Sequence, residues 1–308
     1  MLRAADRTPG PVGISLFEDD VALSWRDMVV LMLTISDNPS TDVLIRRLGI
    51  DTLNTTAARL GMSDTVVKFD VMTMLDSIGH DLGHAGWNDL ISWSAAAPPD
   101  ESARADESLL TTRALDPRKG TRTSPRDMIT LLRLIWNGQA GPPGACERIR
   151  ALMARQLTRD RIASAFRPPV RVAAKSGSLV GVARNEIGVI SYPDGRRYAA
   201  AVFTRSRPGS GNAAISSAIG TATAHAVASL VRAPCERPSR YPVRASDLWV
   251  MSTTTRVSLS SGGLRPPRWP RETSSVASCQ GCCASAVSLY PRRFQEDCRV
   301  RISPRRSA

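Results

Sequence analysis

Lysine is nearly absent from this 308-residue chain, in which Lys68, Lys119 and Lys175 are the only lysines among 41 basic residues. The formal net charge of +13 would ordinarily suggest a nucleic acid or an anionic membrane as the partner. However, residues 234–308 alone carry 13 arginines against 5 acidic residues. An excess of arginine without lysine is explained more simply by GC-rich coding than by a phosphate-binding surface. We therefore expect no nucleic-acid partner, and DNA binding by the Arg-rich tail is the weakest alternative.

Long apolar runs are also lacking. No stretch is long enough to cross a bilayer, and the N-terminal sequence MLRAADRTPGPVG has no apolar core of a signal peptide. With 42% hydrophobic and 22% charged residues, the composition is that of a soluble globular protein with one large domain or two modest ones. As written, nothing exports the chain, so we expect a cytoplasmic monomer without a membrane span.

The N-terminal part of the chain predicts three helices. Ser24 is a suitable N-cap for the first, and Asp27 lies three places on, where a carboxylate favours the helix dipole. The second is expected from about residue 40 to Gly49, a good residue to end a helix, and the third over residues 51–61.

The polar, proline-containing stretch at residues 94–123 predicts a long loop. A clear helix follows Ser124, because Pro125 suits the first helical position and Asp127 falls in the first turn. Another helix is expected over residues 145–155.

From residue 170 the pattern changes to that of three β-strands, carried by VRVAAKSGS and RNEIGVISYPDGRRYAAAVFT. The Asp-Gly pair in YPDGRR indicates a hairpin between the second and third strands. A helix of small residues follows and ends near Val231. Helices, then an antiparallel sheet, then a helix predict an α/β (α+β) fold class, with the sheet flanked by helices.

We divide the chain into one domain at residues 1–233 and a tail at residues 234–308. The tail is rich in Arg, Ser, Pro and Cys, and it shows neither a sustained hydrophobic face nor the low complexity of a linker. It is either a disordered extension or the product of a reading frame that has slipped out of register, and we favour the slipped frame.

Two polar motifs carry candidate chemistry. Ser-Asp-Asn at 36–38 lies between two predicted helices, and Lys-Ser-Gly-Ser at 175–178 lies on a predicted strand. Together they resemble the motifs of class A serine β-lactamases and penicillin-binding proteins. The helix that begins TSPRDM and the hairpin RNEIGVISYPDG extend the similarity over about residues 14–231. The resemblance implies a β-lactamase/transpeptidase-like fold without a cofactor, and a small-molecule substrate that is a β-lactam or a D-Ala-D-Ala-like peptide.

The resemblance implies catalytic roles for Lys175 and Ser36. Lys175 would supply positive charge in a partly dry cleft, where charge counts for more than in water, and Ser36 would relay a proton to the leaving nitrogen. Asn38 would bond the side-chain amide of the substrate. On spacing alone, Ser36 and Asn38 are better explained as helix caps. The matching segment at 175–178 favours the catalytic interpretation.

Four further residues would line the ligand by the same resemblance. Ser176 and Ser178 would donate hydrogen bonds to its carboxylate, and the Ser178 N–H would form half of an oxyanion hole. Gly177 lets the ligand lie close to the strand backbone. Arg184, nine residues past Lys175, matches an arginine that helps bind the carboxylate in some class A enzymes. The alternative is that Arg184 is a solvated strand residue.

The nucleophile of the family is missing. In the motif Ser-x-x-Lys, the amine lies one helical turn from the hydroxyl that it activates, and none of the three lysines has a serine three positions before it. The N-terminal strands and the nucleophile helix would precede Met1. We therefore expect a truncated, inactive chain whose sheet keeps three strands.

Glu107, in the sequence ESLLT, is the candidate for the base that deacylates class A enzymes. Thr111 replaces the asparagine expected there, and the alternative is a solvated loop carboxylate. Without this base, the parent protein would resemble a penicillin-binding protein more than a β-lactamase.

His80 and His84 have the spacing of a helical metal site. Gly79 and Gly83 disfavour a helix there, and no glutamate lies between the histidines to act as a base. We expect no metal site.

These observations predict a serine β-lactamase-like hydrolase that lacks its nucleophile. One alternative is a relative of the penicillin-binding transpeptidases and carboxypeptidases that act on D-Ala-D-Ala. Another is a non-catalytic remnant that binds carboxylates or peptidoglycan peptides.

Overall fold

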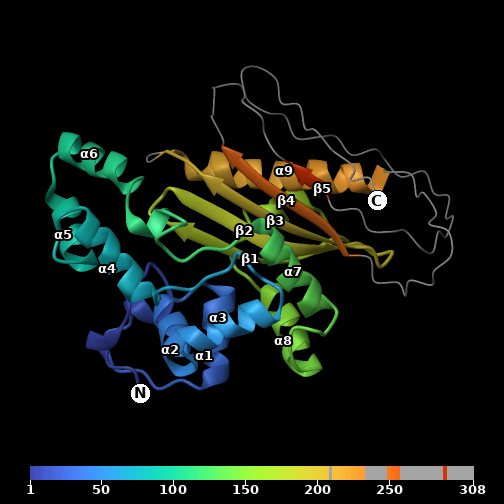
Figure 1. The fold of residues 1–308 in the computed structure, drawn as a ribbon, viewed down its shortest axis with the longest axis horizontal. Helices are drawn as coiled ribbons and strands as arrows, with labels where there is room; N and C mark the ends of the chain where they lie inside the picture. Colours follow the sequence, from blue (N-terminus) through green and yellow to red (C-terminus); the bar gives the residue numbers. More distant parts are fainter. Residues whose placement is uncertain (208–209, 233–247, 257–286, 290–308) are drawn as a thin grey trace.

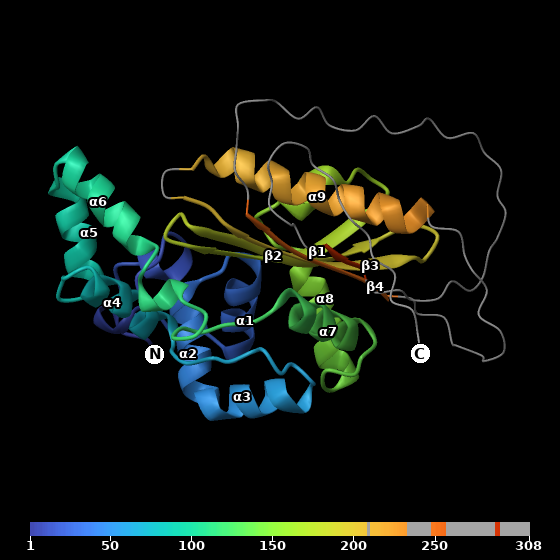
Figure 2. The same cartoon turned by 45° about the horizontal axis from the view of Figure 1, so that its top comes forward.

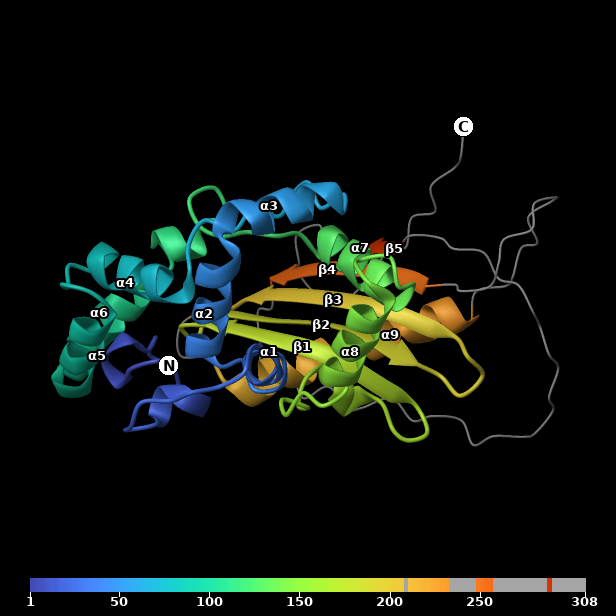
Figure 3. The same cartoon turned by 90° about the horizontal axis from the view of Figure 1, so that it is seen from below.

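A twisted β-sheet with helices on both faces forms the centre of the protein. The computed structural model describes residues 1–207, 210–232, 248–256 and 287–289 (Figure 1). One long helix, α9, covers one face of the sheet, while α7, α8 and the N-terminal helices cover the other (Figures 2 and 3). This layered arrangement confirms the predicted fold of a sheet flanked by helices.

The described strands form one sheet in the order β1-β2-β3-β4-β5. They are β1 (Arg171–Leu179), β2 (Ala183–Ser191), β3 (Arg197–Arg205), β4 (Leu248–Arg256) and β5 (Val287–Leu289). The first three pair antiparallel, as predicted, with Lys175 opposite Ile187 and Ser178 opposite Arg184. At the predicted hairpin, the N–H of Tyr192 donates to the carbonyl oxygen of Arg196.

Strands β4 and β5 were not predicted. β4 pairs parallel with β3, and β5 pairs parallel with β4, so the sheet exceeds the three strands expected. Both come from the 234–308 tail, in which we expected no regular structure. The segment LWVMSTTTR of β4 contains the β-branched and aromatic residues typical of strands, but the arginine-, serine- and proline-rich sequence around it conceals this signal. The other residues of the tail prediction lie outside the described part of the chain.

The N-terminal helices follow the predicted order. They are α1 (Trp25–Thr34), α2 (Asn38–Leu48) and α3 (Ile50–Arg59). The Ser24 hydroxyl caps α1 by accepting from the Asp27 N–H at 3.1 Å, as predicted.

The long loop predicted at residues 94–123 is wrong for much of its length. A helical insert consists of α4 (Val71–Asp81), α5 (Trp87–Ala96) and α6 (Pro99–Leu109). The adjacent prolines 98 and 99 suggest a break in helical structure, yet they only mark where α6 begins. Proline suits the first turn of a helix, since the N–H groups there have no partner within the helix.

The remaining helices agree with the predictions in type and order. They are α7 (Pro125–Trp136), α8 (Pro143–Met153) and α9 (Asn212–Arg232), with short 3₁₀ turns at Ala4–Asp6, Gly13–Leu16, Arg113–Leu115 and Ile162–Ala165. By length and composition α9 could span a membrane, but 44% of its apolar window is buried. Ile215 and Ile219 of α9 belong to the core against the sheet, so its apolar character has a structural cause.

The core consists of two apolar layers, one on each face of the sheet. Val189 and Ile190 are consecutive residues of β2 and both are fully buried, but they belong to different layers. This follows from the alternation of side chains along a strand. A third cluster, around Ile78 and Leu90 of the helical insert, also contacts Leu179, the last residue of β1, and Val180, which follows it. The helical insert is therefore anchored beside the end of the strand that carries Lys175.

Candidate active site

The structure brings together the two motifs that the sequence separates by 139 positions. The Nζ atom of Lys175 on β1 donates to the Oγ atom of Ser36 at 2.8 Å and to the Ser176 carbonyl oxygen at 2.6 Å. Ser36 is exposed, whereas Lys175 is half-buried. A solvent-accessible hydroxyl therefore lies against an amine that is partly shielded from water.

Ser36 occupies the junction between α1 and α2. Its φ of 64° lies in the left-handed region, which is uncommon for residues other than glycine. The neighbouring Asp37 is fully buried, and its carboxylate accepts from the backbone N–H groups of Ser40 and Ile14, each at 2.8 Å. Asp37 is thus the N-cap of α2. The alternative that Ser36 and Asn38 are the helix caps is wrong.

Burial changes the acidity of the lysine. The pKa of Lys175 is lowered from 10.5 to about 8. Burial is the largest cause, the positive charge of Arg161 acts in the same direction, and the nearby Glu186 opposes both. A substantial fraction of the Lys175 amine is therefore neutral just above physiological pH.

Arg161 is a site residue that the sequence analysis missed. The residue is buried, with 7% of its surface exposed. Its guanidinium donates to the carbonyl oxygens of Gly177 and Asn185 at 2.9 and 2.7 Å, and to the Ser178 hydroxyl at 2.6 Å. No motif marks an isolated arginine in a turn, so only the fold reveals this contact.

The polar network continues through Gln156 and Glu186, both buried. The Ser176 N–H donates to the side-chain oxygen of Gln156, whose amide donates to Glu186 at 2.9 Å. Glu186 also accepts from the Ile162 N–H at 2.5 Å. Burial raises the pKa of Glu186, while the hydrogen bonds from Gln156 and Ile162 oppose that rise. The network fixes the backbone of β1 beside Lys175.

The free edge of β1 is accessible at Ser178. The Ser176 N–H is bonded to Gln156, so it points away from β2. Alternate N–H groups of a strand point to the same side, which places the Ser178 N–H on this free edge as well. Gly177 and Ser178 are both exposed, and a Cβ atom added at Gly177 would meet no atom within 4 Å. A ligand can therefore approach the strand backbone here.

Arg184 is buried, with 6% of its surface exposed, so the alternative of a solvated strand residue is wrong. Its guanidinium donates to the Gly181 carbonyl oxygen at 2.7 Å and to the Ser206 hydroxyl at 3.1 Å. Burial, and then the charge of Arg161, lower the pKa of Arg184. Arg184 lies opposite Ser178 in the sheet, and its role in carboxylate binding stays a prediction.

Two other predicted residues have different surroundings. The Asn38 side-chain amide donates to the Pro9 carbonyl oxygen at 2.7 Å, which ties α2 to the N-terminal segment. Glu107 is exposed near the end of α6. Within the described residues, no hydrogen bond joins Glu107 to Ser36 or to β1, and its role as a base stays a prediction.

The histidine pair lies in the helical insert. His80 and Gly79 lie in the last turns of α4, contrary to the expectation for Gly79, but the helix ends at Asp81. Gly83 and His84 lie beyond it, so no single helix carries both histidines. Because Gly79 has no side chain, the backbone of Gly86 can lie directly against α4 at this position. Among the described residues, no group of three metal-ligating side chains occurs.

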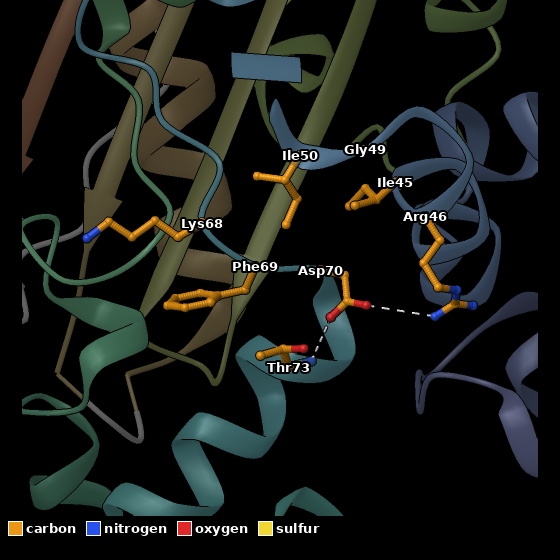
Figure 4. A pocket seen from close by; sticks show the side chains of 8 residues that line it. All are labelled: Ile45, Arg46, Gly49, Ile50, Lys68, Phe69, Asp70 and Thr73. Atoms are coloured by element: carbon orange, nitrogen blue, oxygen red, sulfur yellow. Dashed lines mark hydrogen bonds and ion pairs between the residues drawn. The ribbon is translucent and has the colours of Figure 1, made fainter. Parts of the chain in front are cut away.

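A separate cavity of about 340 Å³ lies between the end of α2 and the start of α4 (Figure 4). Ile45, Ile50 and Phe69 give it apolar walls, and Arg46 and Asp70 approach each other at 3.8 Å beside it. It lies at the opposite end of α2 from Ser36 and is therefore distinct from the Ser36–Lys175 site.

Comparison with known proteins gives concordant matches. A family model described as the β-lactamase enzyme family matches residues 1–230. The chain is 25% identical over 212 residues to the β-lactamase regulatory protein BlaB of Streptomyces cacaoi, a match that covers 65% of this chain and 66% of that protein. The chain thus spans just under two thirds of the length of this relative.

Solved structures show the same similarity. The β-lactamase of Sphaerobacter thermophilus is 25% identical, with a TM-score of 0.55 over 76% of this chain and 73% of that one. PBP-A is 21% identical, with a TM-score of 0.55 over 75% of this chain and 70% of that one. A class A β-lactamase of Bacteroides cellulosilyticus is 19% identical, with a TM-score of 0.54 over 75% and 73%. The last two likenesses show the fold alone.

Proposed function

Because the chain belongs to the β-lactamase enzyme family, we propose that the Ser36–Lys175 site binds a β-lactam or a D-Ala-D-Ala-like peptide through the ligand carboxylate. The observation that carries this proposal is the contact between Ser36 and Lys175 beside the accessible edge of β1. A carboxylate is the ligand group that this positive site favours.

The cationic groups and the serines have complementary parts in this proposal. Lys175 and Arg161 supply positive charge in an enclosed region, where electrostatic attraction is stronger than in water. The Ser178 oxygen already accepts from Arg161, so its own hydrogen is free to donate to a ligand carboxylate. The Ser178 N–H on the free edge provides a second donor for a ligand carbonyl.

We expect these 308 residues to bind such ligands without sustained turnover. They contain no Ser-x-x-Lys motif, and in the described residues no hydrogen bond joins Glu107 of α6 to the Ser36–Lys175 pair. Hydrolysis of an acyl group attached to the protein requires a positioned base to activate water, and we expect it to be slow here. A transpeptidase or carboxypeptidase ancestry is equally compatible with such a site.

Calorimetry with an N-acetylated peptide ending in D-Ala-D-Ala tests the binding proposal. We expect saturable binding of the free acid, and binding at least about tenfold weaker for its C-terminal amide, because a charge-assisted hydrogen bond contributes roughly 1.5–3 kcal/mol. Ser178→Ala should weaken binding of the acid, whereas Ser229→Ala on the distant face of α9 should not. Equal affinity for the acid and the amide, or no binding at millimolar peptide, would contradict the proposal.

A chromogenic cephalosporin such as nitrocefin tests the expectation about turnover. We expect hydrolysis to stop at no more than about one equivalent per chain, because deacylation requires a positioned base and, among the described residues, Glu107 makes no hydrogen bond to the Ser36–Lys175 pair. Many turnovers per chain, unchanged in Ser36→Gly and Lys175→Met variants, would show that another site performs the reaction.

A regulatory role is a second candidate, because the Streptomyces cacaoi relative bears the name of a β-lactamase regulatory protein. The helical insert packs against Leu179 and Val180 at the end of β1. A ligand that shifts this strand would therefore also shift the helices of the insert. Hydrogen exchange with and without benzylpenicillin tests this role. Protection that spreads from β1 into α4 and α5 would support it, while protection confined to β1 would favour simple binding.

A further inference from the structure

The Ser36–Lys175 pair combines a hydroxyl nucleophile with an amine that can act as its base, so it can do more than bind a ligand. We propose that Ser36 is itself an acylatable nucleophile in this chain, with Lys175 as its general base, so that one acyl group per chain is transferred to Ser36. For β-lactam acyl donors this inference rests on the proposed function. For small serine-reactive donors it stands alone.

Geometry is the first support. The Lys175 Nζ atom and the Ser36 Oγ atom lie 2.8 Å apart, within the distance required for direct proton transfer. Serine–lysine pairs are a recognised variant of the serine nucleophile with a general base. Ser36 is exposed, so an acyl donor can reach its hydroxyl without displacing a packed side chain.

The position of Ser36 is fixed from both sides. On one side, Thr34 is buried and its carbonyl oxygen accepts from the Leu157 N–H at 3.0 Å. On the other, Asp37 is held by the N–H groups of Ile14 and Ser40. Between these anchors the backbone of Ser36 adopts a φ of 64°. Unfavourable backbone conformations of this kind are retained where the surrounding structure imposes them, often at functional sites.

The electrostatic surroundings of Lys175 suit a base. Burial and the charge of Arg161 favour the neutral amine, which is the form that accepts a proton, and the pKa of about 8 makes this form accessible. Glu186 opposes these effects, but its carboxylate is occupied by Gln156 and the Ile162 N–H. The carboxylate of Asp37, next to Ser36, is likewise directed at backbone amides.

The chemical step balances without a further reactant. The Ser36 oxygen attacks the carbonyl carbon of a β-lactam while its proton passes to Lys175. Collapse of the tetrahedral intermediate breaks the ring C–N bond, and the ring nitrogen takes the proton back from Lys175. The product is an ester on Ser36 with the opened ring attached, and the lysine is again neutral.

Covalent labelling tests the proposal. The full chain is incubated separately with a fluorophosphonate, which needs no carboxylate recognition, and with a fluorescent penicillin, and the modified residue is located by peptide mass spectrometry. We expect one label per chain on Ser36 with each probe. With the fluorophosphonate, the rate should rise about tenfold from pH 7 to pH 9 as Lys175 loses its proton. Labelling that persists in urea would overturn the proposal, because it would not require the folded site.

Ser36→Gly is the most informative variant, since glycine adopts a φ of 64° readily and the fold should be preserved. It should abolish labelling, and Lys175→Met should slow labelling at least about tenfold. Ser229→Ala and Lys119→Met, which alter exposed residues away from the site, should leave the rate unchanged. If Ser36→Gly is labelled as fast as the wild type while its melting curve shows a folded protein, the proposal is overturned. A folded Lys175→Met variant that is labelled as fast as the wild type would also overturn the proposal.

The two probes separate this inference from the proposed function. Fluorophosphonate labelling of Ser36 without penicillin labelling would support the nucleophile and contradict the proposed ligand class. Penicillin that raises the melting temperature without labelling Ser36 with either probe would support the ligand class and overturn the nucleophile.

Discussion

Ser36 and Lys175 each adopt a state that is unfavourable for stability. A serine in the left-handed region costs roughly 1 kcal/mol, and burial disfavours the charged form of a lysine. Only one other non-glycine residue of the described chain, Val180, has a positive φ. Costs of this kind concentrate at sites whose geometry serves binding or chemistry.

Ser36→Gly should leave the protein at least as stable as the wild type. Relief of the backbone strain offsets the greater entropy of glycine in the unfolded chain, so we expect a gain of about 0–1 kcal/mol in the free energy of unfolding. Urea denaturation measures this change. Ser229→Gly, within α9, is the matched control and should cost about 1 kcal/mol. A loss at position 36 as large as in the control would show that the hydroxyl contact matters more than the strain.

At the scale of elements, the helical insert depends on a close approach of two backbones. Helix α4 packs against the turn before α5, and the side chain of an alanine at position 79 would overlap the carbonyl group of Gly86. Gly79, which suggests a helix breaker in the sequence, is in fact required for this packing. The contact is local and should be measurable without any ligand.

Gly79→Ala should therefore destabilise the protein by about 1–3 kcal/mol, as expected for overpacking against a backbone that cannot move freely. Gly144→Ala is a matched control, because the first turn of α8 leaves open space around that glycine. The control should be neutral or stabilising by up to about 1 kcal/mol. Thermal melts of both variants measure the two changes in melting temperature. Equal changes would contradict the close approach of Gly79 and Gly86.

The elements that could be predicted from the sequence are those that a few neighbouring residues specify. The caps at Ser24 and Ser124 and the hairpin of β2 and β3 were predicted because a few neighbouring residues specify them. The pairing of Ser36 with Lys175 could be anticipated only from two motifs read together. Arg161 was missed because its hydrogen-bond partners lie on β1 and β2, far from it in sequence. Strand β4 was missed because its pairing with β3, rather than a periodic sequence pattern, identifies it as a strand.

At the scale of the whole molecule, the half-buried Lys175 makes stability depend on pH. Unfolded Lys175 has a pKa near 10.5 and folded Lys175 a pKa of about 8, so between these pH values the unfolded state binds more protons. This contribution to the free energy of unfolding therefore rises with pH across that window. Below pH 8 the full burial cost is present, and the fall in pKa corresponds to roughly 3 kcal/mol.

Lys175→Met should remove this cost together with the two hydrogen bonds of the amine. We expect a net gain of about 1–2 kcal/mol at pH 7 that shrinks by pH 10, where the wild-type lysine is mostly neutral in the folded state. Urea titrations at the two pH values measure it. Lys119→Met, at an exposed position, should show no such pH-dependent gain. A gain at position 175 that is the same at both pH values would show that desolvation of the charge is not its cause.

The Gln156 side chain has a consequence for what can lie beside the sheet. By accepting from the Ser176 N–H it occupies one hydrogen-bonding position on the free edge of β1, and Ser178 is the next position with the same orientation. A long neighbouring strand cannot pair continuously past Gln156, so this edge is protected from addition of further strands and from aggregation. The proposed ligand class fits this arrangement, because a peptide that pairs with the strand at Ser178 must end before it reaches Gln156.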